Sequence, residues 1–192
     1  MSDKKIKVLT ISDHPLLPSG VGTQTKYVIQ ALLSTGKFQI ISLGGAIKHP
    51  SYEPTKTKEH GDDWVIYPVD GYGDKEKVRN IITSYKPDIL WFMTDPIPKF
   101  NKAFYKSNDF IATISKVTSD IVQNVAPEVA EQYIPHAVSP KYFHKFQDRS
   151  EIDLLEKVRQ DNNLTGKFVV FWNNRNARRK MSGSVLFWWK AF

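Results

Sequence analysis

Short apolar runs that alternate with amphipathic segments constrain the fold of this chain more than any other feature of its sequence. The runs have the length and β-branched content of strands buried in a parallel sheet. Parallel strands need long crossover connections, usually helices. The alternation therefore predicts an α/β fold, a Rossmann-like parallel sheet with flanking helices, which binds ligands beyond the carboxyl ends of its strands. The predicted strands are residues 6–11, 39–43, 64–67, 89–93, 110–114, 132–134 and 168–172.

The segments between these runs have the periodicity and the end signals of helices. Helices are predicted at residues 23–33, 75–85, 150–162 and 184–192, with a short one at 100–106 and one that Ser115 caps and that runs to Val125. The first is expected to end at Gly36 and the second to bury Val78, Ile81 and Ile82. The first is expected to bury Tyr27, Val28, Ala31 and Leu32. Residues 44–63 have no clear period, so we expect a surface excursion there.

Positive charge is concentrated at one end of the sequence. Of the net charge of +7, residues 167–192 contribute +6 with no acidic side chain. A localised positive charge indicates a local anion, most simply phosphate. The chain has no cysteine, which excludes disulfides and thiolate metal sites and fits the cytoplasm, where we expect the protein. No apolar run approaches the roughly 18 residues of a membrane span.

A glycine-containing segment, Ser19-Gly20-Val21-Gly22, lies between the first predicted strand and helix. Glycines let a backbone approach a ligand closely, and a helix N-terminus offers free N–H groups to an anion. The spacing is not that of the dinucleotide-binding fingerprint, which turns directly from strand into helix. No acid follows 39–43 at the place of a ribose contact, which disfavours an NAD-linked dehydrogenase. A flexible turn with a helix cap is the alternative interpretation.

A basic segment follows the last predicted strand. Arg175 and Lys180 flank this loop, where a diphosphate would lie at the carboxyl end of the strand. Arginine binds two oxygens at once and lysine supplies a compact charge. Such a pair would stabilise the negative charge that builds up on a nucleotide diphosphate leaving group. A solvated basic loop is the alternative.

Four segments in this order resemble the retaining glycosyltransferases of family 4, which have the GT-B fold of two facing Rossmann-like domains. They are Ile6–Ile11 with Ser19–Leu32, then Phe110–Ser115, then Tyr133–Phe143, and finally Phe168–Lys180 with Ser184–Phe192. The first three resemble the amino-terminal, acceptor-side domain and the segment where the chain leaves it. The last resembles the first strand, phosphate loop and helix of the donor-binding domain.

The resemblance implies transfer of a sugar from a nucleotide-sugar donor to an acceptor, with retention of configuration and without a metal or a further cofactor. Gly20 would be the loop glycine whose N–H faces the donor phosphates, and Arg175 and Lys180 would bind the diphosphate. The catalytic residue stays unassigned. His14, Ser19, Gly22, Ser115 and His136 are further candidates for the cleft. For His14 a surface-loop histidine, and for His136 a packing histidine, is the alternative.

The sequence also departs from the family. His136-Ala137 replaces the usual Asn-Gly of the crossover, which puts the geometry of that turn in doubt. No histidine follows the fourth predicted strand, and the stretch from Met93 to Phe110 is short, as if a segment near residues 96–100 were reduced or lacking. The paired glutamates that hold the donor sugar are expected beyond Phe192.

The predicted organisation is an acceptor-side domain at residues 1–143, a connecting helix at 144–166 and the start of a donor-binding domain at 167–192. The apolar helix 184–192 is expected to pack on the remainder of that domain or to associate with another copy. We expect no nucleic-acid partner, and a membrane partner is left open. The alternative function is a non-catalytic Rossmann-like module whose basic loop contacts nucleic acid or a partner protein.

Overall fold

The computed structural model describes residues 4–45, 48–93, 102–174 and 180–191 of the chain. The chain divides into two compact units, Met1–Ala137 and Val138–Phe192, and each is described by itself. The domain boundaries expected after residues 143 and 166 stay predictions.

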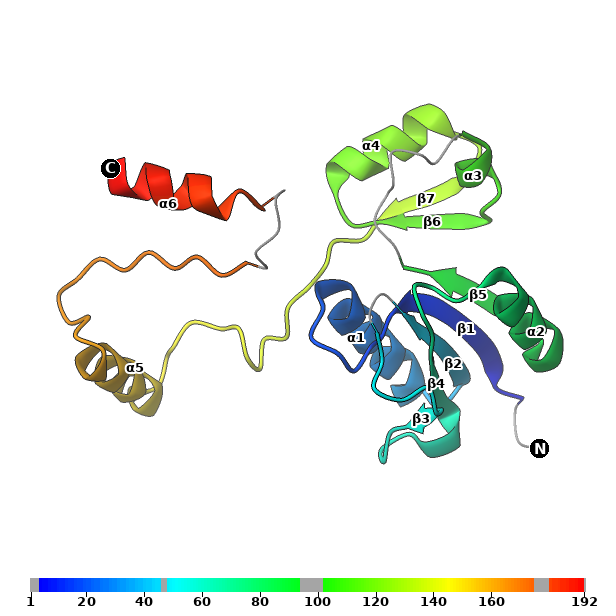
Figure 1. Ribbon diagram of the computed structural model, residues 1–192, viewed down its shortest axis with the longest axis horizontal. Coiled ribbons are helices and arrows are strands. Elements are labelled where there is room, and N and C mark those ends of the chain that lie inside the picture. Colours follow the sequence, from blue (N-terminus) through cyan, green and yellow to red (C-terminus); the bar gives the residue numbers. More distant parts are fainter. Residues whose placement is uncertain (1–3, 46–47, 94–101, 175–179, 192) are drawn as a thin grey trace. The chain divides into compact units, whose positions relative to one another are not determined.

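A five-stranded sheet forms the centre of the first unit, in the order β3-β4-β2-β1-β5 (Figure 1). All neighbours are parallel except β3 and β4. The strands are β1 (Ile6–Asp13), β2 (Phe38–Gly45), β3 (Thr55–Lys56), β4 (Trp64–Pro68) and β5 (Ile89–Phe92). The mixed α/β fold with a mostly parallel sheet is therefore confirmed. The short β3, and the 3-10 turn η1 (Gly61–Asp63) before β4, lie inside the stretch expected to be an irregular excursion.

Helices pack on both faces of this sheet because successive side chains of each strand point to opposite sides. On one face, α1 (Gly20–Ser34) inserts Ile29 and Leu33 into a buried cluster with Val8, Ile40 and Trp64. On the other, Val78, Ile81 and Ile82 of α2 (Lys75–Tyr85) pack against a second cluster, which contains Leu9, Ile11, Leu43 and Val69. The bounds and the inward face predicted for α2 are confirmed.

The inward face predicted for α1 is wrong. The buried residues are Gly22, Thr25, Ile29 and Leu33, whereas Val28 is 40% exposed. Of the four residues expected to be buried, only Leu32 packs against the core cluster. The reason is polar: the Thr25 hydroxyl lies 2.6 Å from the buried Ser12 hydroxyl and donates to the Met93 sulfur. These contacts rotate a small and a polar residue inward, which hydrophobicity alone does not predict.

A chain of buried polar groups lies inside the first cluster. The Thr10 hydroxyl donates to Ser42 Oγ over 2.8 Å, and the Trp64 indole N–H donates to the same oxygen over 3.0 Å. All three residues are at most 1% exposed. Since buried donors are costly when unpaired, this shared acceptor fixes β1, β2 and β4 in register.

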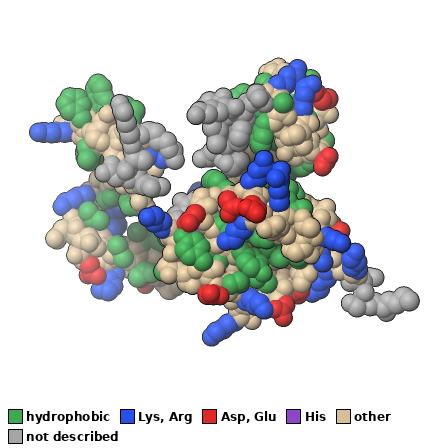
Figure 2. Space-filling model, turned by 45° about the vertical axis from the view of Figure 1, so that its right-hand side comes forward, with side chains coloured by type: hydrophobic (Ala, Val, Ile, Leu, Met, Phe, Trp, Pro, Cys, Tyr) green, Lys and Arg blue, Asp and Glu red, His purple; other side chains and the backbone are tan. Residues whose placement is uncertain are grey.

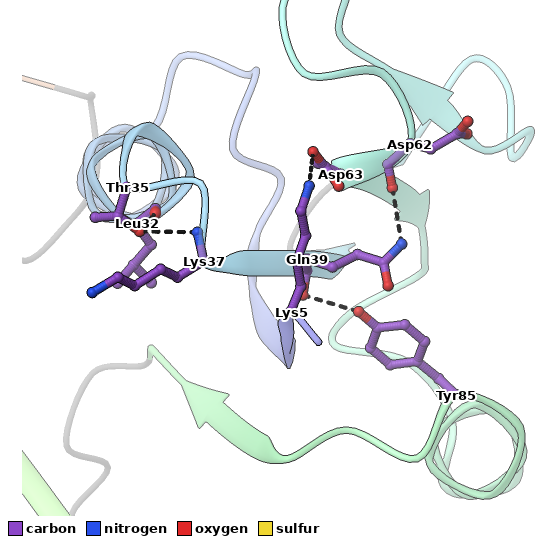
Figure 3. A network of polar contacts seen from close by, with 8 residues as sticks. All are labelled: Lys5, Leu32, Thr35, Lys37, Gln39, Asp62, Asp63 and Tyr85. Atoms are coloured by element: carbon purple, nitrogen blue, oxygen red, sulfur yellow. Dashed lines mark hydrogen bonds and ion pairs between the residues drawn. The ribbon is translucent and has the colours of Figure 1, made fainter. Parts of the chain in front are cut away.

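Structural contacts close the amino-terminal edge of the sheet (Figure 3). Lys5 pairs with Asp63 at 2.6 Å, and the Tyr85 hydroxyl of α2 donates to the Gln39 carbonyl at 3.0 Å. Burial raises the pKa of Tyr85 to about 12, with the nearby Asp88 as a smaller cause. The residue before β1 is thus linked to η1, and β2 is linked to the end of α2, so the opposite, carboxyl edge is the place to look for a ligand.

A second, two-stranded parallel sheet completes the first unit. It pairs β6 (Phe110–Thr113) with β7 (Ala130–Tyr133), and α4 (Lys116–Val125) connects them. A short α3 (Lys102–Lys106) precedes β6. The Ser115 hydroxyl accepts from Thr118 N at 3.1 Å, so the predicted cap of α4 is confirmed.

The second unit contains α5 (Arg149–Asp161) and α6 (Ser182–Ala191). Each corresponds to a predicted helix. The strand predicted at 168–172 is wrong: this segment forms no strand, and Phe168 and Phe171 are 89% and 82% exposed. A strand needs a neighbour for its backbone N–H and C=O groups, and no described segment of this unit pairs with it.

Leu186, Phe187 and Trp188 of α6 are exposed, and association through this helix stays a prediction.

The chain before α5 folds back on the start of the helix. One ring nitrogen of His144 lies 2.7 Å from a Glu151 carboxylate oxygen, and the other lies 2.9 Å from the Pro140 carbonyl. Two acceptors favour the doubly protonated ring, so the Glu151 carboxylate, followed by that carbonyl, raises the pKa of His144.

Candidate functional site

The loop between β1 and α1 lies at a change of direction in the sheet. β1 is flanked by β2 on one side and by β5 on the other, and all three run parallel. The chain leaves β1 through α1 towards β2, whereas β5 lies on the other side of β1 (Figure 1). In open α/β sheets, ligands bind in the crevice that forms where connections diverge in this way. Residues 14–19, here called the β1–α1 loop, border this position.

Ser19 fixes the start of α1. Its hydroxyl accepts from Gly22 N and donates to Asp13 Oδ2, both over 2.8 Å. The helix therefore begins at Gly20, three residues earlier than predicted. Within the described part of the chain, the N–H groups of Gly20 and Val21 have no hydrogen-bond acceptor. Two free donors at the positive end of a helix dipole favour an anion.

The two candidate glycines differ in their surroundings. A Cβ added at Gly20 would have no heavy atom within 4 Å. A Cβ at Gly22 would lie 2.6 Å from the His14 carbonyl oxygen and 2.9 Å from Ser19 Oγ. Packing therefore explains Gly22 fully, because nothing larger fits there. Among the described residues no contact requires a glycine at Gly20, and the space over its Cα is open.

His14 is buried, not a surface-loop histidine. It is 8% exposed, and its Nδ1 accepts from the Leu16 backbone N–H over 3.2 Å. A Cβ at Gly44 of β2 would lie 2.7 Å from the imidazole, so the ring fills the space above that glycine. Burial, followed by the charge of the neighbouring His49, lowers the pKa of His14. The imidazole is therefore neutral at pH 7.

Side chains from two further loops join this edge of the sheet. The His49 ring lies 5.4 Å from the His14 ring, and its Nε2 is 3.1 Å from the Val69 carbonyl. The Tyr72 hydroxyl donates to Asp13 Oδ1 over 3.3 Å. Asp13, His49 and Tyr72 are not among the site residues predicted from the sequence. The position of Asp13 at the end of an apolar strand was the one signal that could have identified it.

The remaining candidates make no hydrogen bond with the β1–α1 loop within the described part of the chain. Ser115 is occupied as the cap of α4. His136 is exposed, but the carbonyl of the next residue, Ala137, accepts from Gln24 Nε2 of α1 over 3.1 Å, which brings the crossover segment to the first turns of α1. Arg175 lies outside the described residues. Lys180 belongs to the second unit, two residues before α6.

Charge is spread over the first unit. Figure 2 shows Lys and Arg side chains interspersed with Asp and Glu on the visible face. Pairs such as Lys5–Asp63 and Lys116–Asp120 are part of this mixture. Among the described residues, no group of three or more acidic or histidine side chains suits a metal ion. None of the helices in the described ranges is both long and apolar enough to cross a membrane.

A scan against protein-family models found no match. A search of curated proteins likewise found none.

Proposed function

We propose that this chain is the acceptor-side domain, with the beginning of the donor-binding domain, of a retaining, metal-independent glycosyltransferase of the GT-B type. The proposal rests on the resemblance to family 4 and on one observation above all. Gly20 opens α1 with a free N–H and open space over its Cα, at the point where the connections of the sheet diverge.

The proposed chemistry is charge stabilisation on a leaving group. The diphosphate of a nucleotide sugar would accept from the N–H groups of Gly20 and Val21. Arg175 and Lys180 would neutralise the charge that develops as the bond from sugar to phosphate breaks. Both carboxylate oxygens of Asp13 accept hydroxyl groups, from Ser19 and Tyr72, and these contacts hold the end of β1 beside the start of α1.

Isothermal titration calorimetry with UDP-glucose, GDP-mannose and ADP-glucose tests this proposal. We expect one of them to bind, and we expect Gly20→Ala to weaken it by about tenfold or more, since a methyl group would displace an oxygen from the free N–H. Arg175→Gln with Lys180→Gln should weaken the same ligand. The matched control is Gly183→Ala in α6, where an added Cβ also meets nothing within 4 Å.

The alternative function gives a different result in the same experiment. A non-catalytic module with a basic loop would bind oligonucleotides with a steep salt dependence and would not bind the nucleotide sugars. Retained oligonucleotide binding in Gly20→Ala, together with no heat from any nucleotide sugar, would overturn the glycosyltransferase proposal.

A further inference from the structure

His14 connects the end of β1 to the start of α1 through contacts made by its backbone and its ring. Its N–H donates to the Gly45 carbonyl and its carbonyl accepts from Leu17 N, both over 3.2 Å. The same carbonyl oxygen lies against Gly22 in α1. The ring accepts the Leu16 N–H at Nδ1. Two backbone N–H groups of the β1–α1 loop, those of Leu16 and Leu17, therefore donate to this one residue.

The contact with Leu16 N–H exists in only one protonation state. An imidazole nitrogen accepts a hydrogen bond only when it carries no proton, so the proton of the neutral ring is on Nε2. Protonation of Nδ1 would place two N–H groups against each other and would charge a buried ring. The hydrogen bond would be lost, and the ring would be driven towards solvent.

The groups around His14 do not outweigh the cost of charging a buried ring. From the loop after β2, His49 faces the ring and opposes protonation. From β1 itself, the adjacent Asp13 is engaged with Ser19 and Tyr72. The other neighbours, Gly44 of β2 and Gly22 of α1, bring no titratable group.

We propose that His14 is a positioning residue, whose neutral ring holds the β1–α1 loop in the conformation that presents the Gly20 N–H and whose protonation releases that loop. The role of His14 in holding the loop does not depend on the proposed function. The effect of His14 on the binding of a nucleotide sugar rests on the function proposed above.

The sign of the resulting pH dependence is unusual. A solvent-exposed histidine beside an anion site strengthens anion binding when it becomes charged. Here acid should weaken binding, because the charged ring cannot hold the loop. The pKa of His14 is lowered on folding, so the stability that it contributes is complete above about 6.5, the ordinary value, and is lost as the pH falls through the lowered value.

The first test uses the chain without ligand. NMR would follow the His14 ring and the exchange of the Leu16 amide hydrogen between pH 8 and 4.5. We expect a titration midpoint below that of an ordinary histidine and loss of Leu16 protection over the same pH range. His14→Asn keeps an acceptor near the position of Nδ1 and does not titrate, so it should restore protection that His14→Phe removes. His144→Asn, in the second unit, is the control.

The second test is calorimetry with UDP-glucose, GDP-mannose and ADP-glucose, whose diphosphate diesters keep a constant charge over this range. For the one that binds, affinity should fall about tenfold for each pH unit below the His14 midpoint, as the competent fraction falls. His49→Asn removes a like charge and should move that midpoint to higher pH.

The two tests separate the two proposals. A His14 midpoint at or above the ordinary value, or a Leu16 amide that stays protected while His14 is charged, overturns the positioning role even if a nucleotide sugar binds. A coupled titration of His14 and Leu16 without any nucleotide-sugar binding supports the positioning role and overturns the proposed function.

Discussion

Alanine substitution at the two glycines of α1 should change stability in opposite directions. At Gly20 the backbone is helical and the space is open. Replacing glycine at such a position stabilises a protein by about 0.4–1 kcal/mol, chiefly because the unfolded chain has less entropy to lose. For a chain of this size, that corresponds to a rise in melting temperature of roughly 1–4 °C.

At Gly22 the same methyl group has no room. Its Cβ would lie 2.6 Å from the His14 carbonyl oxygen, which is held by the Leu17 N–H. Forcing an extra methyl group into a packed site costs about 1–3 kcal/mol, of which the entropy gain returns a part. We expect Gly22→Ala to lower the melting temperature by roughly 2–8 °C.

Thermal unfolding followed by circular dichroism, checked by urea unfolding, measures both effects. Urea midpoints that shift with unchanged slopes would show that stability changed while the surface exposed on unfolding did not. Equal shifts for the two variants would refute the reasoning, because it assigns Gly22 to packing and Gly20 to open space. A destabilised Gly20→Ala would show that a contact within the protein already requires that glycine.

The main features of the fold could be predicted from the sequence because they depend on local periodicity. The inward face of α2 follows from the spacing of Val78, Ile81 and Ile82, and the cap of α4 follows from Ser115 before a helical segment. The face of α1 could not be predicted in this way. It depends on a hydroxyl pair between Thr25 and Ser12, which are 13 residues apart in the sequence.

The candidate site was predictable only in part, for the same physical reason. Ser19 and Gly20 belong to one local segment, whose composition indicates a helix start. The burial of His14 depends on Gly44, which the register of β1 and β2 brings beside it. Likewise, an apolar run such as 168–172 predicts a strand, but a strand also needs a partner, which local sequence does not specify.

Two further predictions concern contacts inside the protein, one in each unit. Ser42→Ala removes the acceptor shared by Thr10 and Trp64, so two buried donors lose their partner. The free energy of unfolding, measured in urea, should fall by roughly 2–5 kcal/mol. The double variant with Thr10→Val should lose less stability than the sum of the two single variants, and strict additivity would contradict the shared acceptor. In the second unit, His144 should titrate above an ordinary histidine, and its contact with Glu151 should be complete below about pH 6.5 and lost as the pH rises through the raised pKa. The Gln147 N–H donates to the same Glu151 carboxylate, so its protection factor, the exchange rate corrected for the intrinsic effect of pH, should fall over that range and stay constant in His144→Asn. A protection factor that is unchanged at high pH would contradict the contact.

Backbone amide shifts during a nucleotide-sugar titration test the central claim most directly. The start of α1 and the start of α4 make a matched pair, since a serine caps each helix. If a diphosphate binds at the open glycine, the amide resonances of Gly20 and Val21 should move in a saturable manner when UDP-glucose, GDP-mannose or ADP-glucose is added. Those of Lys116 and Val117 should stay in place. Equal movement at both helix starts, or saturable binding that leaves the Gly20 and Val21 amides unchanged, would contradict the account.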